Sequence, residues 1–421
     1  MLFFILFAVT AATAIYFYYR RALEYWPRKG IKIPPAEFFF GHIRMVFKLH
    51  DPRVLKFRDF AKMLGTKTYG LNEGARRCLV SSDVNILQEV FVKQFDNFYS
   101  RRVNPIGPNP DTDERVNLFQ SRGVRWKRLR AISAPSFSVN SLKKVRNKLM
   151  EPQEELFREM GAAVKERIKR REELPESAND AAEDFIDLFL DTAAEDIHHE
   201  KSSDFKLAEQ HVEKNLTIPE VISQAVIFLL AGFDTTANAL GYTSWLLSKH
   251  PEVLKKCQEE IDEVCSEENI SYEDLSNLRY LEATCKEALR FYPLGTFASA
   301  RTCMKTTTVC GIEIEEGTAF QADVFSLHFD KEVWGEDADE FKPERWLDPT
   351  RRVPPIAYLP FGGGPRICIG MRLAMMEEKL ALAHILRKFD IVKGTEATEL
   401  ELMGSLTLTP VSVPVKIVSR T

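Results

Sequence analysis

The stretch FGGGPRICIG, residues 361–370, frames a single cysteine, Cys368, with glycines and places an arginine two positions before it. A long apolar segment, 371–389, follows directly and is predicted to form a helix. Glycines let a backbone turn tightly and approach a flat ligand closely. The first N–H groups of the helix and its positive dipole end point back at the sulfur. Together these features favour a thiolate, the form of cysteine that binds iron.

This pattern closely resembles the haem-binding loop of the cytochromes P450. The resemblance implies that Cys368 is the axial ligand of the iron of haem b, iron protoporphyrin IX. Phe361, Gly364 and Gly370 are the other residues of the loop expected to contact the cofactor. A structural thiol beside a glycine-rich turn is the alternative, and the complete ten-residue frame argues against it.

The bulk composition is that of a globular protein with a substantial core: 45% hydrophobic and 28% charged residues over 421 positions. The net charge of −4 argues against a general nucleic-acid binder. Seven cysteines, an odd number without CxxC spacing, fit neither a disulfide framework nor a zinc site and indicate a reducing compartment. The cysteines other than Cys368 are predicted to be small core or surface residues.

The N-terminus reads as a membrane anchor. Residues 2–19 carry no charge, Arg20 and Arg21 follow, and eighteen apolar-leaning residues just suffice to cross a bilayer as a helix. The basic residues after the span would keep the rest of the chain cytoplasmic. A cleaved signal peptide is the alternative, but it requires a basic start and a small-residue cleavage site. We expect an anchor at 1–21, a basic, proline-rich linker at 22–36 and the haem domain at 37–421.

The coarse pattern of the remaining chain predicts a mainly α fold with small β-sheets, as in the single-domain P450 fold. Long helices are expected at 217–250, opened by a capping-box spacing, and at 274–291. Short strands are expected around 67–80, in a hairpin-like stretch at 306–324, and at 405–409 and 411–418. The segment 150–216 is charged and loosely helical.

The helix at 217–250 contains the sequence AGFDTT, 231–236, and a glycine with paired threonines is costly in mid-helix. The Thr235 hydroxyl can bond to a carbonyl one turn earlier and loosen the helix, and Asp234 supplies an ionisable group. By resemblance these two are the acid–alcohol pair that supplies protons during oxygen activation. A polar packing face against another helix is the alternative.

Glu287 and Arg290 lie three apart on one helical face, a common pattern in itself. Followed by the sequence FKPERW at 341–346 and then by the cysteine loop, they match the P450 ExxR motif, which Arg345 completes. The resemblance implies a buried carboxylate held by two arginines, a structural rather than a catalytic set.

Haem propionates are anionic and favour planar arginine partners. Trp126 and Arg130 lie four apart on a predicted helix and match the P450 WxxxR pattern. By position Arg301 and Arg366 are further candidates, and Arg101 is a weaker one for which an exposed loop charge is an equal alternative. The basic residues near the helix and near the cysteine form either a solvated face or a docking surface for an acidic reductase; they are Arg125, Lys127, Arg128, Lys143, Lys144, Arg146, Arg372 and Lys379.

Substrate contacts are expected, again by resemblance, at places where P450s line the distal pocket, although each could equally belong to the core. These residues are Ala231, Phe233, Phe297, Ala298 and Leu406. An apolar, aromatic-lined pocket suits lipophilic substrates.

The resemblance implies a haem-thiolate monooxygenase of the animal microsomal type, anchored in the endoplasmic reticulum membrane with its catalytic part in the cytoplasm. It would take electrons from NADPH through NADPH–cytochrome P450 reductase, with cytochrome b5 as a further donor, and insert one atom of dioxygen into a xenobiotic, steroid or fatty acid. Only 105 residues separate Trp126 from Ala231, well short of the family's usual length. The short segment makes a shortened isoform, inactive or acting as a membrane-bound interaction protein, one alternative. A peroxide isomerase or dehydratase is the other, although such enzymes tend to lack the acid–alcohol pair that Asp234 and Thr235 match.

Overall fold

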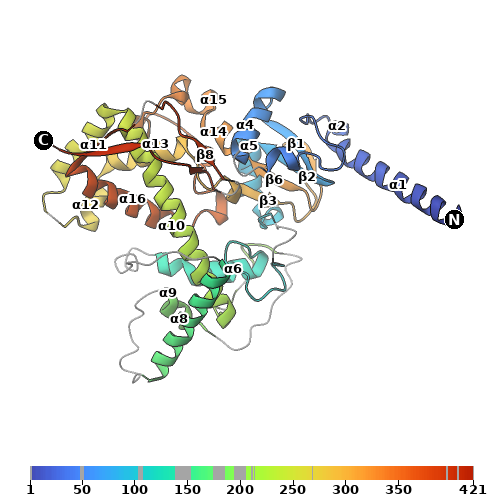
Figure 1. The fold of residues 1–421 in the computed structure, drawn as a ribbon, viewed down its shortest axis with the longest axis horizontal. Coiled ribbons are helices and arrows are strands. Elements are labelled where there is room, and N and C mark those ends of the chain that lie inside the picture. The colour runs from blue at the N-terminus through green and yellow to red at the C-terminus, as the bar shows by residue number, and fades with distance from the viewer. Residues whose placement is uncertain are drawn as a thin grey trace. The chain divides into compact units, whose positions relative to one another are not determined.

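The computed structural model describes residues 2–47, 52–102, 108–137, 153–173, 185–193, 205–209, 212, 214–267, 269–394, 397–404 and 407–420. Two compact units make up the chain (Figure 1). Unit 1 contains Met1–Phe98, Asn238–Ile367 and Glu378–Thr421, and unit 2 contains Tyr99–Ala237 and Cys368–Glu377. Helices dominate and the sheets are small, which confirms the fold class predicted from the sequence.

The main sheet of unit 1 has the strand order β1-β2-β6-β3. Its strands are β1 (Thr68–Glu73), β2 (Arg76–Ser81), β6 (Ala319–Ala322) and β3 (Ala300–Thr302). The β1–β2 hairpin turns through Gly74, whose φ of +61° lies in the left-handed region that glycine adopts easily. β6 runs parallel to β2 and antiparallel to β3.

Three two-stranded sheets complete the β structure: β4 (Thr307–Val309) with β5 (Ile312–Ile314), β7 (Phe389–Lys393) with β10 (Val415–Ser419), and β8 (Leu402–Met403) with β9 (Thr409–Pro410). The stretch predicted as one hairpin at 306–324 is therefore a short hairpin, β4–β5, followed by a strand that joins the main sheet.

The described helices divide between the two units. In unit 1 they are α1 (Leu2–Leu23), α2 (Tyr25–Arg28), α3 (Ile43–Val46), α4 (Arg53–Leu64), α5 (Val84–Gln88), α11 (Pro251–Val264), α12 (Tyr272–Asn277), α13 (Arg279–Phe291), α14 (Val324–His328) and α15 (Lys331–Trp334); in unit 2 they are α6 (Gly123–Ser133), α8 (Gln153–Glu173) and α9 (Phe185–Leu190). α10 (Ile218–Lys249) and α16 (Met371–Leu386) each contribute residues to both units.

The helix predicted at 274–291 is two helices, because the chain leaves helical geometry at Leu278. Two N–H groups of the first turn of α13, on Tyr280 and Leu281, donate to the Glu260 carboxylate at 2.7 and 2.9 Å. A side chain from α11 thus satisfies donors that a helix start leaves without intrahelical partners.

α10 begins as predicted. The Thr217 hydroxyl accepts from the N–H of Glu220, and the Glu220 carboxylate accepts from the N–H of Thr217, both at 3.3 Å. This reciprocal pair is a capping box, and it satisfies two of the donors at the helix start.

α1 ends against the β1–β2 hairpin. The Asn72 amide donates to the carbonyl of Ala22 at 2.9 Å, and the fully buried Trp26 donates its indole N–H to the carbonyl of Leu71. A Cβ atom on Gly70 would lie 2.2 Å from the Trp26 ring, so only glycine permits this packing. The start of the chain is thus fixed to the sheet by buried contacts.

Aromatic side chains extend this attachment. Tyr16 stacks on Phe38 with ring centroids 5.3 Å apart, and Tyr19 meets Phe39 edge-on at the same distance.

Two of the described helices are long and apolar enough to cross a membrane. α1 has none of its apolar window buried, whereas α10 is one-third buried and supplies core residues such as Tyr242 and Trp245. Of the two, α1 therefore has the character of an anchor and α10 that of a core helix.

Candidate cofactor site

Cys368 belongs to unit 2, where its side chain is exposed and two residues separate it from the start of α16. Desolvation by the surrounding protein raises the pKa of the thiol, while hydrogen bonds from the backbone at Gly370 and Met371 and the charges of Arg101 and Arg130 act to lower it. The backbone donors agree with the sequence argument that the helix start faces the sulfur. A metal cation at the sulfur would complete the stabilisation of the thiolate.

The remaining cysteines fit structural roles. Cys78, Cys257, Cys265, Cys285 and Cys303 are buried, and Cys310 is exposed; all seven thiols are free. Burial raises the pKa of Cys78 to about 11 and that of Cys257 to about 12. Buried, protonated thiols of this kind behave as small apolar side chains.

The part of the loop that belongs to unit 1 packs tightly. A Cβ on Gly364 would lie 1.9 Å from the carbonyl oxygen of Phe91, and one on Gly363 would lie 2.9 Å from Leu359. Gly364 also has a φ of +66°. These two glycines are therefore required by contacts with the protein itself, a reason that differs from the close cofactor approach expected from the sequence.

Two predicted propionate partners lie in unit 1 and are buried. Arg301 is 0% exposed and Arg366 is 1% exposed. The Arg301 guanidinium donates to the carbonyls of Ala298 and Ala300 and, at 3.3 Å, to that of Gly363 in the cysteine loop. Phe361 in the same loop is half-buried.

The other predicted partners lie in unit 2. Trp126 is buried on α6, and Arg130 on the same helix is half-buried. Arg101 donates to the carbonyl of Phe119 at 3.4 Å and lies 4.0 Å from the centroid of its ring. Desolvation lowers the pKa of Arg101 to about 10; the charge of Arg130 lowers it further, and the charge of Cys368 raises it. Arg101 is half-buried, so it is not the exposed loop charge that was the alternative. The charges of Arg101 and Arg130 act on the Cys368 sulfur, and Cys368 in turn acts on both guanidinium groups.

α10 presents its central turn to solvent. Ala231, Gly232, Phe233 and Asp234 are exposed, and Thr235 donates its hydroxyl proton to the carbonyl of Ala231 at 2.6 Å. This is the predicted bond to the preceding turn, which weakens the regular helical ladder. A Cβ on Gly232 would meet nothing within 4 Å, so packing against the protein does not require a glycine here.

The basic surface predicted along α6 is mostly internal, which corrects the interpretation of this run as a solvated or docking face. Arg125 and Arg128 are 9% and 6% exposed, and both bind the fully buried Glu220, at 2.9 and 2.8 Å. Burial opposes ionisation of Glu220, but the two arginines hold the pKa of its carboxyl below the ordinary value. From the sequence, only the capping-box spacing at the start of this helix was apparent, and not the pairing of Glu220 with the arginines of α6.

Other members of the run are also engaged. Lys127 donates to the carbonyl of Leu207 at 2.6 Å, and the buried Lys379 donates to the carbonyl of Leu275 and to Glu282. Lys143, Lys144 and Arg146 lie outside the described residues. Arg372 is exposed.

The structure brings Glu287, Arg290 and Arg345 together in unit 1, all within 4% exposure. Glu287 accepts from both arginines at 2.8 Å. Five further hydrogen bonds complete the set. The N–H of Lys342 and the indole of Trp346 donate to the same carboxylate, and Arg290 donates to the carbonyls of His328, Ala338 and Glu340. The charges are thus paired and hydrogen-bonded, which burial demands.

The residues predicted to contact substrate are dispersed between the units. Ala231 and Phe233 lie on α10 in unit 2, whereas Phe297 and Ala298 lie in a 3₁₀ turn of unit 1 and are half-buried. Leu406 lies outside the described residues, and its neighbour Leu408 is buried in the core of unit 1.

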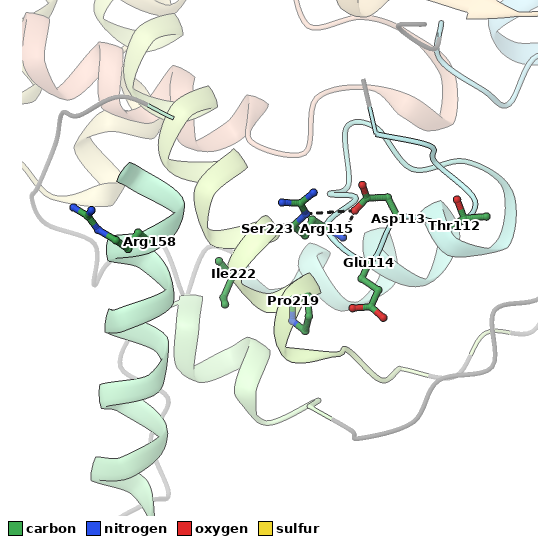
Figure 2. Close-up of a pocket in the computed structure, with 8 residues that line it drawn as sticks. All are labelled: Thr112, Asp113, Glu114, Arg115, Arg158, Pro219, Ile222 and Ser223. Atoms are coloured by element: carbon green, nitrogen blue, oxygen red, sulfur yellow. Dashed lines mark hydrogen bonds and ion pairs between the residues drawn. The ribbon is translucent and has the colours of Figure 1, made fainter. Parts of the chain in front are cut away.

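A cavity of about 670 Å³ opens within unit 2 between the 112–115 segment, the start of α10 and α8 (Figure 2). Its lining mixes charged side chains with the apolar Pro219 and Ile222, and Asp113 and Arg115 pair within it at 3.6 Å (Figure 2). No residue predicted from the sequence to contact substrate or cofactor lines it.

Comparison with known proteins gives consistent results. The family model described as Cytochrome P450 matches residues 32–169 and 142–417. "Putative cytochrome P450 CYP13A10" of Caenorhabditis elegans is 38% identical over 495 residues, covering 94% of this chain and 95% of that protein. "Putative cytochrome P450 CYP13A4" of the same organism is 38% identical, covering 96% of each.

The alignments also contain many positions without a counterpart in this chain. In the first, 94% of the 421 residues is about 396, so about 99 of the 495 aligned positions have no counterpart in this chain. The family model matches this chain in two separate stretches, and these two stretches overlap at residues 142–169 of the chain.

Proposed function

Since this chain belongs to the cytochrome P450 family, we propose that it is a membrane-anchored haem-thiolate monooxygenase in which Cys368 is the axial ligand. The family supports a haem cofactor, dioxygen as co-substrate and a redox partner in general. The observation that carries the proposal for this chain is the exposed cysteine, with backbone donors and two arginines around it.

The residues present fit a haem. A thiolate is a haem-iron ligand, and arginines that the resemblance assigns to propionates are available in both units: Arg301 and Arg366 are buried in unit 1, and Arg101 is half-buried in unit 2. Gly232 adds independent support. A helical glycine costs about 1 kcal/mol relative to alanine, and no contact with the described residues explains it, which is compatible with space left for a bound cofactor.

When bound, the haem supplies the activation of dioxygen, and the protein supplies orientation and electrostatics. In this proposal Cys368 donates electron density through its sulfur. Asp234 takes up and releases protons at its carboxylate, and the Thr235 hydroxyl, held on the carbonyl of Ala231, positions the water that carries them. The exposed Ala231 and Phe233 form the apolar wall beside this pair.

We further propose haem b as the cofactor, NADPH–cytochrome P450 reductase as the electron donor with cytochrome b5 as a second donor, and a lipophilic substrate of the xenobiotic, steroid or fatty-acid type. The decisive experiment reconstitutes the purified full chain with haem, the reductase and NADPH, and measures oxygenated product from a panel of such substrates. Formation of product that needs NADPH supports the proposal; turnover that needs only a lipid peroxide assigns the isomerase activity instead.

Asp234→Asn is expected to lower NADPH-dependent turnover by on the order of 100-fold, because a positioned acid–base group contributes at least that much. Haem content and the spectrum of the reduced carbon-monoxide complex should stay unchanged. The matched control is Asp59→Asn, which neutralises a half-exposed acid in unit 1. Equal turnover of Asp234→Asn and the control would remove Asp234 from the proton path.

The proposed location is the endoplasmic reticulum membrane, with α1 as a single span and the remainder in the cytoplasm. Replacing both Phe7 and Val9 by arginine should abolish resistance to carbonate extraction, because each arginine at the centre of a span costs about 2.5–3.5 kcal/mol. Both side chains are exposed on α1. Val92→Arg, at an exposed apolar position outside α1, is the control and should remain in the membrane fraction. A purified protein that starts beyond residue 21 would show a cleaved signal instead.

The gap of about 99 aligned positions supports a second candidate, a haem-binding but inactive isoform. We propose that the missing positions fall within the central segment, about residues 150–216, because the family-model matches divide close to it. A normal carbon-monoxide spectrum without turnover on any substrate of the panel would select this candidate.

A further inference from the structure

Glu378 is a buried acid that none of the functions assigned above uses. It lies on α16, ten residues after Cys368, and its side chain is 1% exposed. Thr243 of α10 donates its hydroxyl proton to one Glu378 carboxylate oxygen at 2.7 Å. The thiol of Cys285 on α13 also hydrogen-bonds to the carboxyl. Three helices of unit 1 therefore meet at one carboxyl group.

The partners of Glu378 are uncharged. Cys285 remains a thiol because burial, followed by the charge of Glu378, raises its pKa well above the ordinary value. Tyr358, from the segment after the 3₁₀ turn at Pro355–Ala357, also faces this region, and its pKa is raised by burial and then by Glu378.

The charged groups nearby are bound to other partners. Lys379, the next residue on α16, donates to Glu282 and to the carbonyl of Leu275, while Arg290 is bound to Glu287. Cys257 of α11 lies behind Cys285 and is also a buried thiol. Among the described residues, the groups that hydrogen-bond to Glu378 are the uncharged Thr243 and Cys285. Burial therefore raises the pKa of Glu378 to about 7.

The two helices joined by Thr243 and Glu378 are those that carry the proposed chemistry. α10 runs from the Asp234–Thr235 pair to Thr243 in roughly two turns, and α16 runs from just after Cys368 to Glu378 in roughly two turns. Since a helix is stiff over two turns, the contact between Thr243 and Glu378 limits how each helix can shift or rotate.

We propose, on the basis of the haem-thiolate function above, that Glu378 is a positioning residue whose hydrogen bonds to Thr243 and Cys285 fix the helix that follows the cysteine loop to the helix of the proton-transfer pair. The neutral carboxyl performs this role. Its ionisation places a negative charge among uncharged groups in the core, which loosens the junction of α10, α13 and α16.

The pH dependence follows from linkage. The folded pKa is raised above the unfolded value, so the unfolded chain loses this proton first as pH rises, and stability falls between about pH 4.5 and about pH 7. Above about pH 7 both states are ionised and this contribution no longer changes. From pH 5.5 to 8 the unfolding equilibrium constant of the native chain should rise about 27-fold relative to a chain without this carboxyl.

The test compares the full haem-loaded chain with Glu378→Gln, Glu378→Met and Thr243→Val, and with Glu263→Gln, which changes an exposed acid on α11, as the control. Urea unfolding and the spectrum of the reduced carbon-monoxide complex are recorded from pH 5.5 to 8.5. Glu378→Gln, which keeps the hydrogen bonds, should retain the red-shifted Soret band and lose the pH dependence of about 27-fold. Glu378→Met and Thr243→Val should lose at least half of the band at pH 6.

A pH dependence of Glu378→Gln equal to that of the native chain overturns the proposal, and so does a full band in Glu378→Met. A native chain that binds no haem at any pH refutes the haem-thiolate function instead. In that case the urea series on the haem-free chain still measures the pH effect of Glu378, which separates the two failures.

Discussion

Cys368→Ala is expected to remove the red-shifted Soret band of the reduced carbon-monoxide complex completely and to abolish NADPH-dependent oxygenation. The band depends on a thiolate bound to the iron, and alanine offers no ligand. The exposed side chain of Cys368 contacts solvent, so its loss creates no core cavity and the chain should stay folded. The measurement is a difference spectrum of the reduced protein with and without carbon monoxide, beside circular dichroism of the same samples.

Cys310→Ala is the matched control, since Cys310 is the other exposed thiol among the seven. Its spectrum should equal that of the native chain. An unchanged band in Cys368→Ala, or a band lost equally in both variants, would contradict the assignment of Cys368 as the axial ligand.

Glu287→Ala is expected to destabilise the fold by about 3–5 kcal/mol, because it leaves two arginines buried without their shared carboxylate. Five hydrogen-bond donors converge on this carboxylate, from Arg290, Arg345, Lys342 and Trp346. A loss of this size is a large part of the net stability of a typical protein, about 5–15 kcal/mol. We expect little soluble, haem-containing protein at 37 °C, as measured by expression yield and by the midpoint of thermal unfolding.

Glu259→Ala on α11, which removes an exposed acid with a distant lysine partner, should shift the midpoint by less than the scatter between preparations. A midpoint in Glu287→Ala equal to that of this control would show that the buried arginines find other partners. Glu287→Gln should lie between the two, since the amide keeps acceptor capacity but loses the charge.

Local features were predictable because their cause lies within a few residues. The capping box at Thr217 and Glu220, the side-chain bond of Thr235 to Ala231 and the Glu287–Arg290 pair all join residues three or four apart in the sequence. Helical geometry alone brings such residues together. The cysteine loop was recognisable from its ten-residue frame for the same reason.

Features that depend on distant segments were missed. The arginines of α6 looked like a surface because nothing near them in the sequence is acidic; their partner, Glu220, lies about 90 residues away. Gly364 is required by Phe91, which precedes it by more than 270 positions. Glu378 carried a usable signal, because Leu382 and Leu386 follow at spacings of four and eight, which places the acid on the buried face of α16.

The attachment of α1 to the β1–β2 hairpin has a mechanical consequence for a chain embedded in lipid. Asn72 donates to the carbonyl of Ala22, and the Trp26 ring packs directly against Gly70. These contacts restrict rotation of α1 relative to the sheet. Transmembrane helices tilt to match the local thickness of a bilayer. If α1 spans a bilayer as proposed, a membrane thickness that changes the tilt of α1 should turn unit 1 with it, and lipid composition would then change which face of that unit meets the water.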